Sequence, residues 1–173
     1  MLQLLAPHLR IDRVEQLTLA RLGELQLDAL LLDVDCTLKP YRDEEISAKV
    51  AAWLAELRGG GIGLCLVSNG RGARIRRFAQ RIELPFVATA MKPFPLGCRR
   101  AARKLGFPRS RTAMVGDQFF ADVIAARLAG LVSILVRPIR PEEEPWFTRS
   151  KRPLERWFLR HVGVAPRRSG DRS

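Results

Sequence analysis

Five short apolar runs divide the chain, and each ends in polar or charged residues. They cover residues 29–33, 63–68, 85–89, 112–117 and 131–136. Because their apolar residues follow one another without polar alternation, the runs are typical of strands that are buried on both faces. We therefore predict a five-stranded parallel sheet.

Stretches with helical spacing separate these runs. Ile75, Phe78 and Ile82, for example, stand at positions i, i+3 and i+7. The predicted helices cover residues 46–57, 75–82, 98–105 and 120–128, with a further one around residues 14–25. Alternating strands and helices predict an α/β fold, a Rossmann-like three-layer sandwich with helices on both faces of the sheet. Ligands of such folds bind beyond the carboxyl ends of the strands.

The pattern changes after Val136. Three prolines surround a run of three glutamates at residues 142–144, which predicts a loop. A short helix is expected next, with Leu154, Trp157, Phe158 and Val162 on one face and Arg152, Arg156 and Arg160 on the opposite face. We predict a single domain over residues 1–162 and a flexible basic tail over residues 163–173.

Composition is that of an ordinary globular protein. With 173 residues, 47% of them hydrophobic, the chain can bury a core. No apolar run reaches the roughly 20 residues of a membrane span, and the N-terminus does not resemble a signal peptide. The three cysteines have no paired spacing, which excludes a disulfide scaffold and favours a reducing compartment. We therefore expect a cytoplasmic protein.

The positive charge is concentrated in one segment. The formal net charge is +12, and between Arg71 and Arg111 twelve basic residues accompany the single acid Glu83. Such a field attracts anions, which leaves phosphorylated ligands, an anionic membrane surface and nucleic acid as candidate partners. The arginines of the helices in this segment also fit simple solvated faces.

Acidic residues follow two of the predicted strands. Asp33 and Asp35 leave the first run on the same side, and the fourth run ends at Asp117, with Asp122 five residues further on. If these two strands are neighbours, their acids meet at one edge of the sheet. Carboxylates without histidine or cysteine suit Mg²⁺.

The other strand ends supply groups that can hold phosphate. Ser68, Asn69 and Gly70 follow the second run, and Lys92 precedes a proline after the third. A hydroxyl, an amide and a cation can stabilise the oxygens of a phosphoryl group while a carboxylate attacks the phosphorus. A second carboxylate can protonate the leaving oxygen and then activate water. The set predicts phosphoryl transfer through an aspartyl-phosphate.

The order of these groups resembles a known family. The segments Asp33-x-Asp35-x-Thr37, Ser68, Lys92 and Gly116-Asp117-x₄-Asp122 are similar to the four motifs of the haloacid dehalogenase (HAD) superfamily phosphatases. The match covers residues 25–140. With residues 32–35, 116–123 and 147–156 the chain most resembles the YqeG-type group of subclass IIIA, over residues 9–160. The relatives of this group include mitochondrial and cyanobacterial phosphatidylglycerophosphate phosphatases.

The resemblance implies roles for the acids. Asp33 would be the nucleophile and a Mg²⁺ ligand. Asp35 would be the general acid and base and would lend its main-chain carbonyl to the metal. Asp117 would ligate Mg²⁺, with Asp122 as a further ligand, through water, or as the group that orients Lys92.

The resemblance also implies how phosphate is held. Ser68, Asn69 and Thr37 would bind the phosphate or steady its loop, and Lys92 would neutralise the nucleophile and the phosphoryl group. Many relatives carry asparagine where this chain has Cys36, whose side chain we expect to point away from the chemistry. The stretches between the motifs are too short for a cap domain, so the site should be open to bulky substrates.

These inferences combine into one functional hypothesis and two alternatives. We expect a Mg²⁺-dependent phosphatase that converts phosphatidylglycerophosphate to phosphatidylglycerol at an anionic membrane surface, bound through residues 71–111 at the inner membrane face. One alternative is a soluble HAD phosphatase acting on a phosphoprotein, nucleotide or sugar phosphate. The other is an arginine-rich module that binds nucleic acid or protein, with marginal catalysis.

Overall fold

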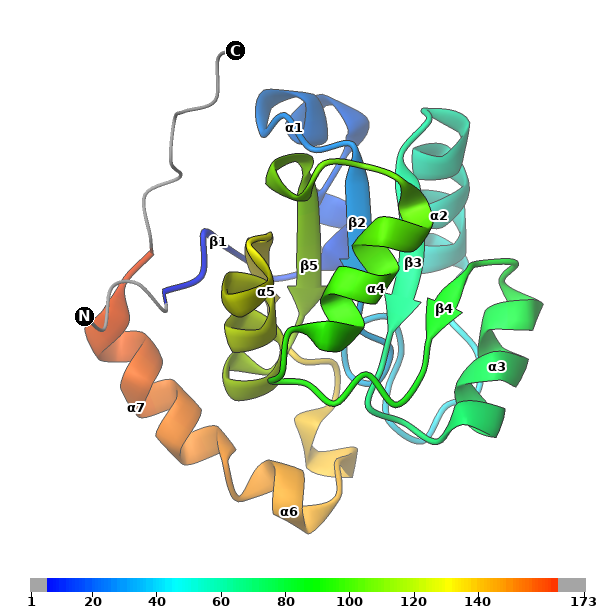
Figure 1. Ribbon diagram of the computed structural model, residues 1–173. Helices are drawn as coiled ribbons and strands as arrows, with labels where there is room; N and C mark the ends of the chain where they lie inside the picture. The colour runs from blue at the N-terminus through cyan, green and yellow to red at the C-terminus, as the bar shows by residue number, and fades with distance from the viewer. Residues whose placement is uncertain (1–5, 165–173) are drawn as a thin grey trace.

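Six parallel strands form one sheet in the computed structural model, which describes residues 6–164 (Figure 1). Their order across the sheet is β1-β6-β5-β2-β3-β4. The strands are β1 (Leu9–Ile11), β2 (Ala29–Leu32), β3 (Gly63–Val67), β4 (Phe86–Val87), β5 (Thr112–Gly116) and β6 (Val132–Val136). The five predicted strands are confirmed, and the strand count is corrected by β1, which adds an edge beside β6.

The helices follow the predicted alternation with several changes. They are α1 (Leu19–Glu24), α2 (Ala48–Gly59), α3 (Gly72–Arg81), α4 (Leu96–Leu105), α5 (Ile124–Ala129), α6 (Trp146–Arg149) and α7 (Arg152–Val162). The helix expected around residues 14–25 is interrupted, because a 3₁₀ turn, η2 (Val14–Gln16), precedes α1. The helix expected over residues 120–128 begins as a π-helical turn, η4 (Phe119–Val123). The proline-rich loop contains a 3₁₀ turn, η5 (Pro141–Glu143), and α6.

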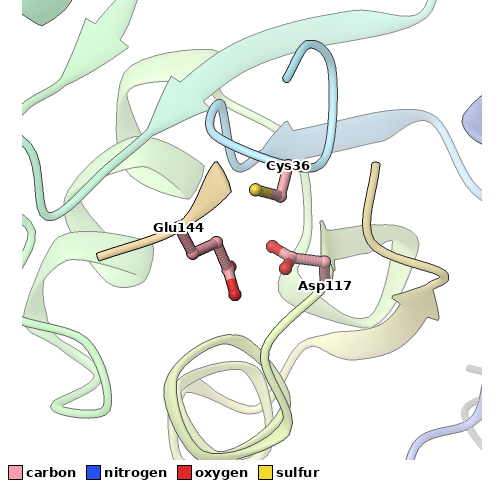
Figure 2. A group of neighbouring side chains, drawn as sticks. All are labelled: Cys36, Asp117 and Glu144. Atoms are coloured by element: carbon pink, nitrogen blue, oxygen red, sulfur yellow. The ribbon is translucent and has the colours of Figure 1, made fainter. Parts of the chain in front are cut away.

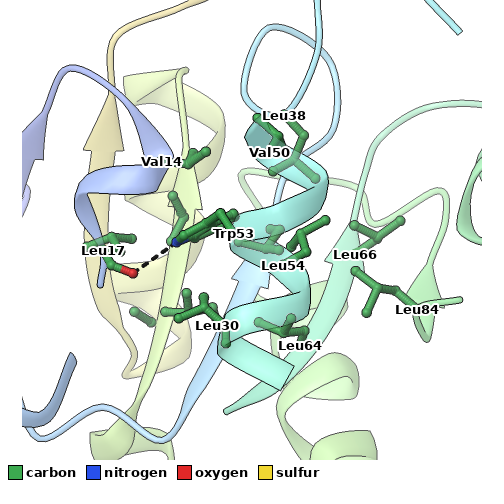
Figure 3. Close-up of a cluster of buried hydrophobic side chains, with 14 of the residues drawn as sticks. Val14, Leu17, Leu30, Leu38, Val50, Trp53, Leu54, Leu64, Leu66 and Leu84 are labelled. Carbon is green, nitrogen blue, oxygen red and sulfur yellow. Dashed lines mark hydrogen bonds between the residues drawn. The ribbon is translucent and has the colours of Figure 1, made fainter. Parts of the chain in front are cut away.

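Apolar residues fill both faces of the sheet. Leu30 and Leu32 of β2 belong to a core with α2 and α3, whereas Leu31 belongs to a second core with α4 and α5. Figure 3 shows the first core, in which the indole of Trp53 donates a hydrogen bond to the Leu17 carbonyl at 3.0 Å. Successive residues of one strand thus support opposite helix layers, which confirms the three-layer sandwich.

The carboxyl ends of β2, β3 and β5 lie at one edge, the lower edge in Figure 1. β2 lies between β5 and β3, because Leu32 pairs with Val115 of β5 on one side and with Leu66 of β3 on the other. The expected adjacency of the first and fourth predicted strands is therefore confirmed. It brings the residues that follow them, Asp33 and Asp117, to the same place.

No cap domain interrupts the described part of the chain. Within residues 6–164, no helix has the length and apolar character needed to cross a bilayer. The predicted flexible tail lies outside the described residues from position 165 onward.

Candidate active site

The loop after β2 carries the first two predicted acids. Asp33 directly follows the strand, and its amide donates to the Val115 carbonyl at 2.9 Å. The loop then turns tightly, because Cys36 adopts a left-handed φ of 61° and its amide donates to the Lys39 carbonyl at 2.8 Å. This turn leaves Asp33 buried at the strand end and Asp35 half-buried beside it.

Lys92 lies between two of the acids. Its ammonium donates to Asp33 Oδ1 at 2.5 Å, to Asp122 Oδ1 at 2.6 Å and to the Val67 carbonyl at 3.0 Å. Each of its three protons therefore has an acceptor. Burial alone would lower the pKa of Lys92, but the two carboxylates raise the pKa above its usual value. Lys92 is thus a fixed cation beside the predicted nucleophile.

The side chain of Asn69 holds the backbone of Lys92. Its amide nitrogen donates to the Lys92 carbonyl at 2.9 Å, and its oxygen accepts from the Lys92 amide at 2.8 Å. The structure therefore gives Asn69 a positioning role where direct phosphate contact was expected. The Ser68 hydroxyl accepts from the Gly70 amide at 3.0 Å, and its own proton is left to be donated to a phosphate oxygen.

Asp117 and Asp122 approach from the end of β5 and from η4. The buried Thr37 hydroxyl donates to Asp117 Oδ1 at 3.0 Å, so Thr37 fixes a carboxylate and does not line the cavity. The backbone amide of Gln118 donates to Asp122 Oδ2 at 3.0 Å. Gly116 makes room for Asp122, because a Cβ at this position would lie 2.2 Å from its Cγ.

Asp33, Asp117 and Asp122 form one buried cluster. One oxygen from each carboxylate lies within 4.8 Å of the others. Burial, which Lys92 only partly offsets, raises the pKa of Asp33 to about 7, and burial raises the pKa of Asp117 well above its usual value. Crowded, buried carboxylates are costly without a compensating cation, and hard oxygen donors are the ligands that Mg²⁺ prefers. The residues present therefore fit a divalent ion.

Asp35 is held apart from this cluster by two cations. Lys39 Nζ donates to its Oδ1 at 3.0 Å, while Arg74 donates to Oδ1 at 2.9 Å and also to Oδ2. Burial would raise the pKa of Asp35, but Arg74 and Lys39 outweigh it and hold this pKa below its usual value. The sequence did not predict Lys39, which lies outside the motif. Arg74 belongs to a helix that begins just after Asn69, so an arginine facing the site was one of two interpretations of that helix, the other being a solvated face.

Arg152 connects α7 to the site. Its guanidinium donates to the Asp117 carbonyl at 2.8 Å and also contacts the Asp117 carboxylate. It contacts Glu144 at 2.5 and 3.1 Å and Glu155 at 3.3 Å, and both glutamates are buried. Three buried carboxylates therefore surround the guanidinium, and the helical spacing of the sequence did not predict these partners.

Cys36 faces Asp117 and Glu144 (Figure 2). Its Sγ and one oxygen from each carboxylate lie within 4.8 Å of one another. The expectation that this side chain points away from the acids is thus wrong. Burial and the two carboxylates raise the pKa of the Cys36 thiol, so the thiol stays protonated and poorly reactive at neutral pH.

A cavity of about 200 Å³ opens beside these groups. Its lining includes Asp33, Asp35, Ser68, Asn69, Gly70, Arg74 and Lys92, together with Tyr41, Gln118, Ala121, Glu144, Pro145, Phe147 and Thr148. The segment around α6 thus forms one wall, which sequence reasoning did not foresee. A larger cavity of about 850 Å³ lies between residues 12–15, 37–50 and 136–140, but none of the four predicted acids lines it. We therefore take the smaller cavity as the site.

The fold and the site define an α/β enzyme whose buried acids and lysine act at the carboxyl edge of a parallel sheet. The family model described as haloacid dehalogenase-like hydrolase matches residues 6–130, and the chain belongs to this family. The match confirms the prediction of a HAD-type hydrolase.

Individual proteins show the same relationship. The chain is 27% identical over 149 residues to the probable phosphatase YqeG of Bacillus subtilis (strain 168), covering 86% of each chain. The cobalt-bound deoxy-D-mannose-octulosonate 8-phosphate phosphatase (YrbI) of Haemophilus influenzae has a TM-score of 0.55 at 14% identity, over 81% of this chain and 92% of that chain. A putative HAD subfamily III A hydrolase of Legionella pneumophila has a TM-score of 0.52 at 14% identity, over 82% and 87%. The two structures show the shared fold.

Proposed function

We propose that the protein hydrolyses phosphomonoesters through an aspartyl-phosphate on Asp33. An Asp33 oxygen attacks the phosphorus and the bond to the leaving oxygen breaks, while Asp35, which has taken up the proton of the incoming phosphomonoester monoanion, gives that oxygen a proton and an alcohol departs. Asp35 then takes a proton from water, whose oxygen attacks the phosphorus. The bond between phosphorus and Asp33 breaks, inorganic phosphate leaves with the proton that Asp35 took from water, and both groups return to carboxylates.

The remaining residues hold charge and geometry during these steps. Lys92, 2.5 Å from Asp33, balances the negative charge that a phosphoryl group brings to the nucleophile. Ser68 and the main chain around Gly70 offer donors to the other phosphate oxygens. Asp33, Asp117 and Asp122, with the Asp35 carbonyl, would hold Mg²⁺, which supplies electrostatic screening between the phosphate and the attacking carboxylate.

One observation carries the proposal: a buried lysine bridges the predicted nucleophile and a second acid within a cluster of three carboxylates beside a small cavity. The names of the relatives agree with it. The Bacillus protein is described as a probable phosphatase and the Haemophilus enzyme as a sugar-phosphate phosphatase with bound cobalt. Phosphatase activity is common to both descriptions, and a bound metal is named for the Haemophilus enzyme alone.

The test is phosphate release from para-nitrophenyl phosphate. We expect turnover with Mg²⁺, none with EDTA, and none in Asp33→Asn, which keeps the shape of the nucleophile but not its charge. Asp12→Asn, an exposed acid outside the cavity, is the matched control and should keep wild-type activity. Turnover that survives in Asp33→Asn would contradict the proposal.

We further propose phosphatidylglycerophosphate as the substrate, because the rim of the cavity is apolar and open. Phe147 and Tyr41 line the cavity and are exposed, and Trp146 beside them is 79% exposed. Met91 and Phe94, on either side of the Lys92–Pro93 pair, are 59% and 60% exposed. Exposed aromatic and apolar side chains around a phosphate site suit a lipid head group that stays in its bilayer.

The basic helices support the same substrate. Arg76, Arg77, Arg100, Arg103 and Lys104 on α3 and α4 are exposed and form no ion pair with another described residue. Each basic residue near an anionic membrane contributes about 1 kcal/mol of attraction. We therefore propose that the protein binds peripherally to an anionic membrane face through residues 71–111 and the apolar rim.

A substrate screen decides among the remaining alternatives. Phosphatidylglycerophosphate in mixed micelles should be hydrolysed faster than a phosphopeptide, a nucleotide or a sugar phosphate, and Asp33→Asn should hydrolyse none. Faster hydrolysis of one of the soluble compounds would show that this compound class, and not the lipid, is the substrate. Retention of RNA at about 0.2 M salt without any turnover would favour the binding module.

A further inference from the structure

Arg74 is hydrogen bonded to Asp35, the residue that the proposed mechanism needs to be accessible. Its guanidinium, from the first turns of α3, donates to both oxygens of Asp35, and Lys39 donates to Oδ1 as well. Both Asp35 oxygens are therefore engaged by cations before any substrate binds, although Asp35 lines the cavity. In the proposed function, which this inference presupposes for its catalytic part, Asp35 must reach the leaving oxygen. One of its two cationic partners has to move away.

The two partners differ in how easily they can move. The Lys39 side chain is 2% exposed and donates also to the Pro40 carbonyl at 3.2 Å, so it is fixed under the loop. The Arg74 side chain is 43% exposed and lies along the cavity. Gly70 keeps space open for it, since a Cβ there would lie 2.8 Å from Nη2. Arg74 is thus the exchangeable partner of Asp35.

A second anion is the natural new partner for this guanidinium. Among the described residues that line the cavity, Lys92 and Arg74 are the two cations. Lys92 is saturated by Asp33, Asp122 and a carbonyl, whereas Arg74 can rotate toward the solvent side of the cavity. A guanidinium binds phosphate oxygens in the same paired geometry that it uses for a carboxylate.

We propose that Arg74 binds a second anionic group of the substrate, beyond the scissile phosphomonoester, and thereby releases Asp35 toward the leaving oxygen. The substrate class is a phosphomonoester that also carries a phosphate diester or second phosphate a few bonds away. Phosphatidylglycerophosphate has this chemistry, and so do soluble bisphosphates. Binding of the second anion would be coupled to exposure of the general acid.

Steady-state kinetics with two substrates tests this coupling. Dibutanoyl phosphatidylglycerophosphate, which is short-chained and free of micelles, carries two anionic groups, and para-nitrophenyl phosphate carries one. In Arg74→Gln, the loss of kcat/KM for the lipid should exceed the loss for the aryl phosphate by about tenfold to hundredfold, the range of a charged hydrogen bond. Arg74→Lys should recover part of it. Lys49→Gln, an exposed residue of α2 outside both the cavity and residues 71–111, should change the kcat/KM of neither substrate.

Equal losses for the two substrates would overturn the inference and leave Arg74 as a support of Asp35. A binding measurement separates this result from failure of the proposed function. In the Asp33→Asn background, calorimetry should show glycerol bisphosphate binding at least about tenfold tighter than orthophosphate, and Arg74→Gln should abolish the difference. If the difference holds but the wild type shows no turnover, the proposed function fails and the second-anion site stands. If there is no difference, the site is wrong whatever the turnover.

Discussion

Arg152 of α7 donates a hydrogen bond of 2.8 Å to the main-chain oxygen of Asp117, at the end of β5. The same guanidinium contacts the Asp117 carboxylate and the buried Glu144 and Glu155. A residue from the last described helix therefore fixes the orientation of a predicted metal ligand. Sequence distance hides the relationship, because 35 residues separate the two partners.

Removing this guanidinium should destabilise the protein and weaken metal binding. In Arg152→Gln, Glu144, Glu155 and Asp117 lose their shared cation, and breaking a buried charge network typically costs about 3–5 kcal/mol. Urea unfolding measures the loss, and Mg²⁺ titration by calorimetry measures the affinity. Arg156→Gln, an exposed residue of the same helix, should leave both unchanged. A fully stable Arg152→Gln protein with normal Mg²⁺ affinity would show that α7 docks independently of the site.

Gly116→Ala should displace Asp122 and slow turnover. The new Cβ would lie 2.2 Å from Asp122 Cγ, so the carboxylate that orients Lys92 would have to shift. We expect a loss of about 1–3 kcal/mol in stability and a decrease in kcat of about hundredfold, as for a misplacement of roughly 1 Å. Gly23→Ala is the control, because nothing lies within 4 Å of its added Cβ on α1. Wild-type kcat in Gly116→Ala would remove Asp122 from the mechanism.

Much of the fold was predictable because the strands are buried on both faces. The runs at β2, β3, β5 and β6 are almost continuously apolar, and the helical stretches between them predicted a parallel sheet. β1 escaped prediction because it has three residues, one of them Arg10, and exists only through pairing with β6. The break between η2 and α1 likewise depends on tertiary packing, since Leu17 between them accepts a hydrogen bond from Trp53.

The acids of the site were predictable because each follows a strand, and strand ends of a parallel sheet converge. Asp33, Asp117 and Asp122 do meet, with Lys92 between Asp33 and Asp122. The partners that orient these groups were not predictable. Arg152 has the spacing of a solvated helix face, which is also the pattern of Arg74 on α3. Their ion pairs depend on how α7 and α3 pack against the strand ends, and no local pattern encodes that.

Mg²⁺ should raise the melting temperature of the wild-type protein. An ion that binds only the folded state stabilises it by about 2.7 kcal/mol at one hundred times its Kd. The stabilisation arises because the ion relieves the repulsion among Asp33, Asp117 and Asp122. Differential scanning fluorimetry with and without EDTA measures the shift, with Na⁺ at equal ionic strength as the control. In Asp117→Asn the shift should be much smaller, and an unchanged shift would place the ion elsewhere.

All three cysteines should resist thiol reagents in the native protein. Cys36, Cys65 and Cys98 are buried free thiols, and burial raises the pKa of Cys65 to about 11 and that of Cys98 to about 12. Thiolate is the reactive species, so at pH 8 an aromatic disulfide reagent should find almost none in the folded state. The same reagent should titrate three thiols in guanidinium. A fast-reacting native thiol, mapped to Cys36 by mass spectrometry, would show that the loop after β2 opens to solvent.

Loss of the exposed aromatic pair on α6 should weaken membrane binding. Trp146 and Phe147 are 79% and 55% exposed, so Trp146→Ser/Phe147→Ser should keep the wild-type melting temperature. Burying each side chain in a bilayer interface contributes about 1–3 kcal/mol, so vesicle affinity should fall at least about tenfold. Co-sedimentation with vesicles of equal phosphatidylglycerol and phosphatidylcholine measures this, and phosphatidylcholine alone should bind little. Leu128→Ser is the control, since Leu128 on α5 is 51% exposed and lines no part of the cavity. If the double variant binds vesicles as the wild type does, and salt abolishes this binding, the attachment depends entirely on the arginines of residues 71–111. The apolar rim would then have no part in membrane docking.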